Sequence, residues 1–310
     1  MSRVIVVVDM EGATGIVDRK ECARTYPEYY KRGVVQLTHD VNAVSKGLKA
    51  GGIEDIVVCD MHGRGQNILK NQLDPHIKLV NPRLHDLDKF LEKGCDGVVL
   101  LCFHAMAGTP NGFVSHTLIP FLRVRVNGQS VGETALVGWL CGTYDVPIVM
   151  VTGDEACIEE AEKFLPGVSA VAVKKAKNRE VAHCFPQEEM RRLIEETAMA
   201  TAKQLSQYKV YRSQEPILME AAFRTPDEAD LVAAIPRTKK TTARVVAYQS
   251  EKYSETFKFL SAATYLVVSS WFDEPMQKLT ATDEGQKIFE KWDHPFREEW
   301  MREPQSLWYE

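Results

Sequence analysis

Residues 3–12 read RVIVVVDMEG, a run of β-branched residues that ends on an acidic pair, Asp9 and Glu11. The run is too short for a helix and is apolar from Val4 to Val8, a pattern typical of a parallel strand that is covered on both faces. We therefore predict a central strand over residues 3–9, with polar side chains at its carboxyl end.

The segments that follow alternate between helix and strand. In residues 28–50, apolar side chains recur at spacings of three and four and Gly51 and Gly52 supply a stop, which predicts an amphipathic helix. The alternation continues with strands at residues 55–60, 77–81, 96–103 and 148–152 and helices at residues 85–93 and 155–165. Strands separated by helices imply right-handed crossovers, so the predicted fold class is α/β, with a doubly wound, mainly parallel sheet.

The sequence also predicts a β-hairpin and a second domain. Asn127-Gly128, between the segments at 122–126 and 129–131, is the signature of a tight hairpin before a helix that starts near Glu133. The second half contains a predicted helix at 187–207, strands at 217–223 and 243–249 and a helix at 254–268. We therefore expect an α/β domain at residues 1–178 and a smaller α+β domain at residues 179–310. The charged stretch beyond Glu274 is either a helical tail or an oligomer contact.

Composition and charge exclude several classes of function. The chain has 310 residues and a net charge of −5, from 38 Lys and Arg against 43 Asp and Glu, so no large positive field is available for a nucleic acid. The longest apolar runs fall far short of the ~20 residues that span a bilayer, and the sequence suggests no leader peptide. Seven cysteines, without a Cys-x-x-Cys pair, indicate reduced thiols. We expect a cytoplasmic protein that binds neither nucleic acid nor membrane.

Candidate metal ligands follow three of the predicted strands. Asp9 and Glu11 come after the first strand, His62 after the second, and His104 after the strand that ends at residue 103. Because the carboxyl ends of parallel strands meet at one edge of a sheet, these side chains are expected to lie together. Carboxylates with neutral imidazoles form the ligand set of a catalytic metal site. With Glu133 as a fifth ligand, three carboxylates suit two divalent ions about 3.5 to 4 Å apart better than one ion.

Other polar residues are assigned supporting or structural roles. His116 is expected to act as an acid or base, or as an anion stabiliser, and Asp60 is expected to orient a ligand histidine. Asp154 and Glu155 fit a helix N-cap and a first-turn acid better than a site. The remaining groups are interpreted as structural, with Cys102 in the core and the basic clusters Lys174, Lys175, Lys177 and Lys239, Lys240 on solvated faces.

A set of motifs points to one known family. These motifs are Val8-Asp9-Met10-Glu11-Gly12, Asp60-Met61-His62, His104-Ala105, Ser115-His116, Val131-Gly132-Glu133, Tyr144-Asp145-Val146-Pro147 and Thr152-Gly153-Asp154. In this order and at these separations, the sequence resembles the DppA-type zinc-dependent D-aminopeptidases over about residues 3–178. The resemblance implies a binuclear zinc aminopeptidase in which Asp9, Glu11, His62, His104 and Glu133 match the metal ligands and His116 matches the catalytic histidine. It also implies a homo-oligomer, since the members of that family are similar in forming ring-like decamers that enclose their active sites.

The leading hypothesis for the function is hydrolysis of the amide bond at the free N-terminus of short peptides, with D-amino-acid peptides as candidate substrates. The expected nucleophile is a metal-bridged hydroxide, because coordination brings the pKa of bound water down towards ~7 from about 15.7. Zinc is the expected metal, although manganese and cobalt suit the same ligands. Two alternatives stay open: an amidase that acts on cell-wall-derived or non-peptide amides with the same dinuclear site, and a non-catalytic α/β protein that binds a metal or an anion.

Overall fold

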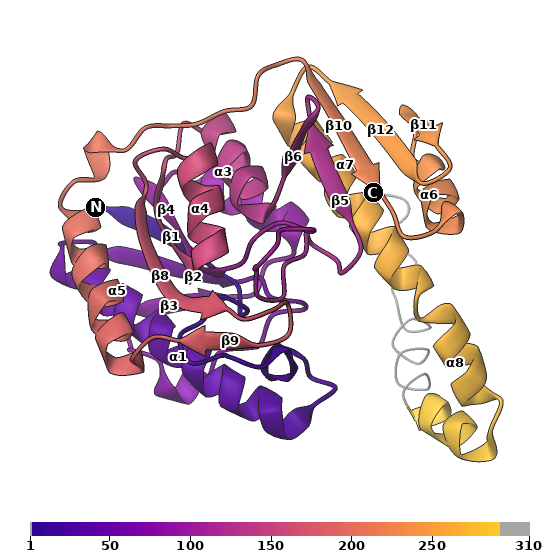
Figure 1. Cartoon of the computed structure of the whole chain (residues 1–310), viewed down its shortest axis with the longest axis horizontal. Coiled ribbons are helices and arrows are strands. Elements are labelled where there is room, and N and C mark those ends of the chain that lie inside the picture. Colours follow the sequence, from indigo (N-terminus) through magenta and orange to yellow (C-terminus); the bar gives the residue numbers. More distant parts are fainter. Residues whose placement is uncertain (1, 292–310) are drawn as a thin grey trace, which may run out of the picture. The chain divides into compact units, whose positions relative to one another are not determined.

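The computed structural model describes residues 2–291, and the chain divides into two compact units, Met1–Thr264 and Tyr265–Glu310. The first unit contains a seven-stranded sheet in the order β3-β2-β1-β4-β7-β8-β9 (Figure 1). Its neighbouring strands are parallel except β8 and β9, which confirms the predicted α/β class with a mainly parallel sheet. The strands are β1 (Arg3–Val8), β2 (Asp55–Asp60), β3 (Ile77–Val80), β4 (Gly97–Phe103), β7 (Ile148–Asp154), β8 (Ser169–Ala176) and β9 (Ala182–Cys184).

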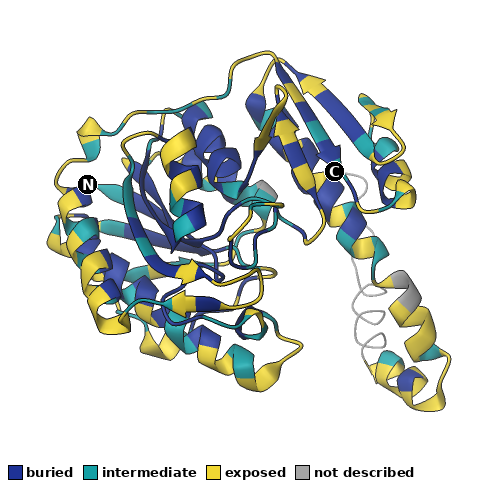
Figure 2. Ribbon diagram, in the orientation of Figure 1, coloured by how far each residue is buried: buried dark blue, intermediate teal, exposed yellow. Residues whose placement is uncertain are grey.

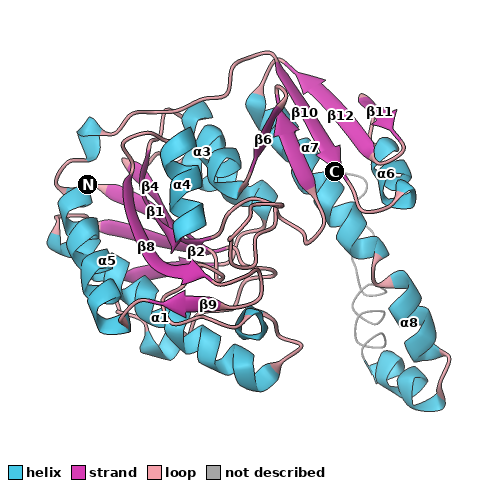
Figure 3. Ribbon diagram, in the orientation of Figure 1, coloured by secondary structure: helices cyan, strands magenta, loops and turns pink. Residues whose placement is uncertain are grey.

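Helices cover both faces of this sheet (Figure 3). On one face, Val6 and Val8 of β1 belong to the same apolar cluster as Leu37 and Val44 of α1 and Ile194 of α5. On the other face, α4 packs against β7 and β8, and α3 against β4. The central strands β1, β2, β4 and β7 are buried almost throughout, as Figure 2 shows, which explains their nearly continuous apolar sequences. The helices are α1 (Pro27–Ala50), α2 (Leu87–Leu91), α3 (Glu133–Thr143), α4 (Glu155–Phe164) and α5 (Gln187–Ala202).

Several boundaries differ from those predicted. The helix predicted at residues 85–93 is a 3₁₀ turn, Leu84–Asp86, followed by the short helix α2. The helix predicted at residues 187–207 ends at Ala202, and a separate 3₁₀ turn spans Leu205–Gln207. Further 3₁₀ turns lie at Arg19–Cys22 and Lys70–Gln72.

A second, antiparallel sheet in the first unit has the strand order β11-β12-β10-β5-β6. The predicted hairpin is confirmed, because Asn127 and Gly128 both adopt positive φ, 50° and 80°, between β5 and β6. Its strand β5 pairs with β10, which comes from the second half of the chain. The expected division into two domains after residue 178 stays a prediction. The elements are β5 (Arg123–Val126), β6 (Gln129–Val131), β10 (Ile217–Ala222), α6 (Pro226–Ala233), β11 (Thr238–Thr242), β12 (Val245–Ser250) and α7 (Tyr253–Ser270).

The second unit is helical where the structure describes it. It contains the end of α7, then α8 (Asp273–Thr280), and residues 283–291 are also helical. This agrees with the helical interpretation of the stretch that begins after Glu274, whereas residues 292–310 of that stretch lie outside the described residues. Within residues 2–291, no helix combines the length and the apolar character that crossing a membrane requires.

Candidate metal centre

The sheet brings all six predicted site residues to one edge. Asp9 and Glu11 follow β1, His62 follows β2, and His104 follows β4, while Glu133 is the first residue of α3. These strands are neighbours in the parallel sheet, so their carboxyl ends lie side by side. His116, on the loop between β4 and β5, joins them by stacking its ring on that of His104.

The candidate ligand atoms form two groups that share the carboxylate of Asp9. His62 Nδ1 lies 3.1 Å from Asp9 Oδ1 and 3.2 Å from Glu11 Oε2. His104 Nε2 lies 3.2 Å from Asp9 Oδ2 and 3.2 Å from Glu133 Oε1. The two oxygens of Asp9 therefore face two different imidazoles, each of which has a further carboxylate beside it.

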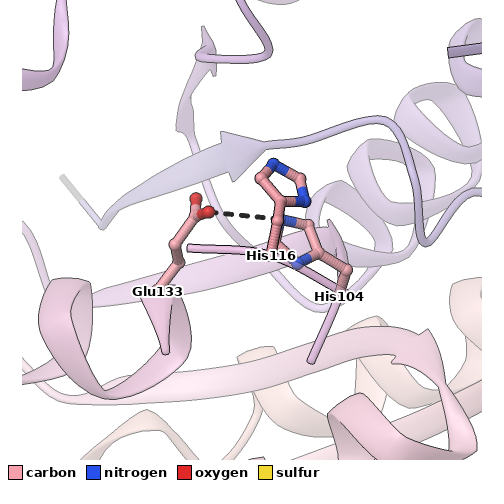
Figure 4. Close-up of side chains that lie close together, drawn as sticks. All are labelled: His104, His116 and Glu133. Carbon is pink, nitrogen blue, oxygen red and sulfur yellow. Dashed lines mark ion pairs between the residues drawn. The ribbon is translucent and has the colours of Figure 1, made fainter. Parts of the chain in front are cut away.

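His116 lies directly against the second group. Its ring is nearly parallel to that of His104, with centroids 4.0 Å apart and 12° between the planes. Figure 4 shows the two imidazoles beside Glu133, and donor atoms of the three residues lie within 4.8 Å of one another. His116 Nδ1 donates to the carbonyl oxygen of Val114 at 2.7 Å, so its Nε2 carries the lone pair.

The donor set fits divalent metal ions. Asp9, Glu11 and His104 are only 8%, 4% and 1% exposed, so carboxylates of like charge crowd together away from water. His104 Nε2 and Glu11 Oε2 are buried and form no hydrogen bond with any described residue, although both lie within ion-pair distance of other groups of the site. Nitrogen and carboxylate oxygen ligands without thiolates are typical of catalytic zinc rather than structural zinc.

The electrostatics of the cluster follow from burial and close contact. Burial raises the pKa of Asp9, but its contacts with His104 and His62 outweigh burial and hold that pKa well below its usual range. Burial lowers the pKa values of His62 and His104, but the neighbouring carboxylates raise both well above the ordinary value. Burial and the charge of His104 lower the pKa of His116, which favours its neutral form. The protonated forms of His62 and His104 are thus favoured by the neighbouring carboxylates, and their positive charge offsets the negative charge of the cluster.

The backbone around Asp9 and Glu11 lies unusually close to β4. We call residues 9–16 the acidic loop. Gly12 N donates to Cys102 O at 2.8 Å, and a Cβ on Gly12 would lie 2.1 Å from Phe103 O, so only glycine fits there. Cys102 itself has a φ of 63°, at an irregularity in the pairing of β4 with β7. This contact places the acidic loop beside His104.

A backbone carbonyl orients His62, one of the candidate ligands. His62 Nε2 lies 2.9 Å from Cys22 O, which leaves Nδ1 to face the carboxylates. Asp60 was expected to orient this ring, and that expectation is wrong, because its carboxylate instead accepts from Asn67 N at 2.6 Å and Asn67 Nδ2 at 2.8 Å. Asn67 Nδ2 in turn donates to His62 O at 2.7 Å. Asp60 thus supports the backbone of His62 through Asn67, a contact partner that no motif in the sequence revealed.

The segment that carries His116 is held by several partners. We call residues 113–118 the histidine loop. Asp154 caps α4 by accepting from Cys157 N, as its N-cap assignment predicted, and it also accepts from Phe113 N at 2.7 Å. At the other end of the loop, Leu118 N donates to Glu133 Oε1 at 2.7 Å. The histidine loop is therefore tied to α4 and to one of the candidate ligands.

Two buried residues beside the site were missed in the sequence. Glu160 of α4 accepts from Met106 N at 2.7 Å, and burial raises the pKa of its carboxyl to about 7. Lys174 of β8 was assigned to a solvated face, and that assignment is wrong, because its side chain is fully buried. Both belong to elements whose sequences look like ordinary charged surface segments, so no local signal distinguished them.

Comparison with known proteins agrees with this geometry. A family model of peptidase M55, described as D-aminopeptidase, matches residues 2–262. The chain belongs to this family. It is therefore a peptidase, and hence a hydrolase, which confirms the family that the sequence motifs suggested.

The M55 peptidase also has relatives that match over most of their length. It is 29% identical over 278 residues to a D-aminopeptidase of Bacillus subtilis (strain 168), covering 87% of this chain and 99% of the relative. A solved structure, the zinc-dependent D-aminopeptidase DppA from Bacillus subtilis, described as a self-compartmentalizing protease, superposes with a TM-score of 0.81 at 26% identity. That match covers 86% of this chain and 98% of the solved chain.

Proposed function

We propose that this M55 peptidase is a two-zinc aminopeptidase that releases the N-terminal residue of short peptides that contain D-amino acids. The observation that carries the proposal is the shared carboxylate of Asp9, with one oxygen facing His62 and the other facing His104. A carboxylate in this position can bridge two ions, with Glu11 completing one group and Glu133 the other. The zinc dependence and the D-aminopeptidase activity named for its relatives support the same conclusion.

Each residue has a defined part in this proposal. When bound, the zinc ions activate water and polarise the scissile carbonyl. The carboxylates of Asp9, Glu11 and Glu133 would hold the ions and compensate their charge in a site from which water is largely excluded. Burial and the charge of His104 lower the pKa of His116, which favours the neutral form, so Nε2 would accept a proton during attack and return it to the leaving amine.

Metal analysis with an assay panel tests the proposal. We expect two zinc ions per chain and turnover of D-aminoacyl peptides that stops in a strong chelator. A purified protein that holds no divalent metal and hydrolyses peptides in the chelator would refute the two-zinc mechanism. Turnover of cell-wall-derived or non-peptide amides in place of peptides would favour the amidase alternative, and stoichiometric binding without turnover would favour the non-catalytic one.

A variant of His116 separates its catalytic role from metal binding. His116→Ala removes the proton carrier but leaves Asp9, Glu11, His62, His104 and Glu133 in place, so kcat is expected to fall by about 10²–10⁴-fold with zinc retained. The measurement is kcat together with zinc content per chain. A loss of one zinc ion would instead make His116 a ligand of the group that contains His104 and Glu133.

We also propose that the peptidase forms a cytoplasmic homo-oligomer, a decamer by its resemblance to the family. The description of the solved relative as self-compartmentalizing supports an assembly, and the seven free cysteines fit a reducing compartment. Light scattering of the full chain measures the assembly directly. A monodisperse monomer under assay conditions that retains full activity would contradict it.

A further inference from the structure

The structure contains a buried lysine whose ammonium group contacts both loops of the metal centre. Lys174 Nζ donates to Glu11 O at 2.6 Å and to Ile16 O at 2.7 Å, and it lies 4.9 Å from the ring centroid of Phe113. Glu11 and Ile16 belong to the acidic loop, and Phe113 is the first residue of the histidine loop. One side chain from β8 therefore touches both segments.

The surroundings of Lys174 are costly for a charge. Its side chain is fully buried, and burial lowers the pKa of its ammonium group more than the nearby charges, that of Asp154 among them, raise it. Taking an ammonium out of water carries a large desolvation cost, and an apolar residue of similar size would fill the space without it. The two carbonyl contacts and the aromatic face compensate part of this cost. Unlike an apolar side chain, the ammonium group can hold specific backbone oxygens in place.

The positions of these two carbonyl oxygens determine the direction in which the Glu11 side chain points. Glu11 O and Ile16 O lie near the two ends of the turn that carries the Glu11 side chain. Its Oε2 lies 3.2 Å from His62 Nδ1, so a rotation of the Glu11 peptide would move this oxygen away from the imidazole. Asp40 and Cys102 hold the middle of the turn through Thr14 N and Gly12 N, but neither contacts the carbonyl of Glu11. Lys174 alone among the described contacts fixes that carbonyl.

We propose that Lys174 is a positioning residue for zinc binding. It fixes the carbonyl of Glu11 and supports the ring at the start of the histidine loop, so that Glu11 points towards the ion held with Asp9 and His62. This inference rests on the proposed function, because it assigns Lys174 a role only if the site binds zinc. The chain offers a matched control in Lys175, the next residue of β8, whose exposed ammonium pairs with Glu155 at 2.8 Å.

The first experiment compares Lys174→Met with Lys175→Met. Zinc is titrated into the metal-free full chain against a competing chelator, and the number and affinity of the binding steps are measured. Supporting contacts behind metal ligands change affinity by about 10–100-fold, so we expect Lys174→Met to weaken one of the two steps by that factor. Lys175→Met is expected to match the wild type. A wild-type protein that binds no zinc would refute the proposed function. If the wild type binds zinc, the comparison of its affinity with that of Lys174→Met decides the inference about Lys174.

The second experiment asks whether Lys174 acts through Glu11. In a double-mutant cycle, Lys174→Met is expected to lower zinc affinity in the wild type and to have little further effect in Glu11→Gln, because the residue it positions is already altered. A general loss of packing would instead lower the melting temperature equally in both backgrounds and leave zinc affinity unchanged. The affinity coupling therefore separates positioning from a structural role.

The outcomes decide the inference in each case. Wild-type zinc affinity in a folded Lys174→Met protein overturns it, as does an undiminished effect in Glu11→Gln. If Lys174→Met does not fold, Lys174→Gln takes its place, because it keeps an N–H donor but has a shorter side chain and no charge. Lys174→Gln is expected to bind zinc several-fold more weakly at one step, and an unchanged affinity in this variant overturns the inference as well.

Discussion

Replacing Gly12 by alanine tests how tightly the acidic loop is fitted against β4. An added Cβ would lie 2.1 Å from Phe103 O and 2.4 Å from the carbonyl carbon of Cys102, whereas ordinary contact begins at 3.4 Å. These are backbone atoms, so the loop must move by about 1 Å, since no flexible side chain can give way. Overpacking of this kind costs about 1–3 kcal/mol. Loss of the Gly12–Cys102 hydrogen bond adds about 0.5–1.5 kcal/mol.

The combined cost of about 1.5–4.5 kcal/mol corresponds to a fall in melting temperature of roughly 3–18 °C, at about 2–4 °C per kcal/mol for a large domain. Displacing Asp9 and Glu11 by about 1 Å is also expected to lower kcat/KM by about 10²-fold. The assays are thermal unfolding by circular dichroism, zinc titration and steady-state kinetics. Gly94→Ala is the control, because Gly94 has a φ of 77° with open space around its Cβ position. There the backbone strain costs about 1–2 kcal/mol without changing zinc affinity. A Gly12→Ala protein with wild-type stability and activity would refute the reasoning.

Further predictions concern the groups that surround the ligands. Burial raises the pKa of Glu160 to about 7 from 4.5, so its stabilising contribution is complete below pH 4.5 and is lost as the pH rises through 7. As the pH rises from 4.5 to 8, the free energy of unfolding of Glu160→Gln is therefore expected to increase by roughly 3 kcal/mol relative to that of the wild type. Urea unfolding of the zinc-free proteins measures this difference. Parallel pH profiles of the two proteins would contradict the prediction. Asn67→Ala leaves the buried Asp60 carboxylate without its two donors and is expected to lose about 1–3 kcal/mol, with weaker zinc binding. Chelation of the wild type is expected to lower its melting temperature, because an ion that binds only the folded chain at 100 times its Kd adds about 2.7 kcal/mol.

The sequence was sufficient to predict the residues that gather at the sheet edge. Asp9, His62 and His104 each follow an apolar run, and the carboxyl ends of parallel strands meet whatever the details of packing are. The Asn127-Gly128 turn was equally accessible, because a two-residue hairpin is a local structure. Both predictions depend on residues that are close in sequence or on a rule that holds for every parallel sheet.

Features that depend on distant packing could not be predicted in this way. Lys174 follows an alternating segment and precedes another lysine, and nothing local indicates that the acidic loop covers its ammonium group. The partner of Asp60 was missed for the same reason, because Asn67 reaches it by folding back from the loop after β2. Strands β8, β9 and β11 and helix α6 were not predicted, since their sequences are short or charged. Whether a polar group is buried depends on the folded chain as a whole and not on the residues next to that group in the sequence.

The pairing of β5 with β10 has a consequence for biosynthesis. Every proposed zinc ligand, up to Glu133, leaves the ribosome before β10 does. Until β10 is synthesised, the hairpin formed by β5 and β6 has an open edge that can pair with another nascent chain. Translation of the intervening segment therefore sets a minimum time during which this edge must be shielded, and a pause before Ile217 would favour aggregation over correct folding.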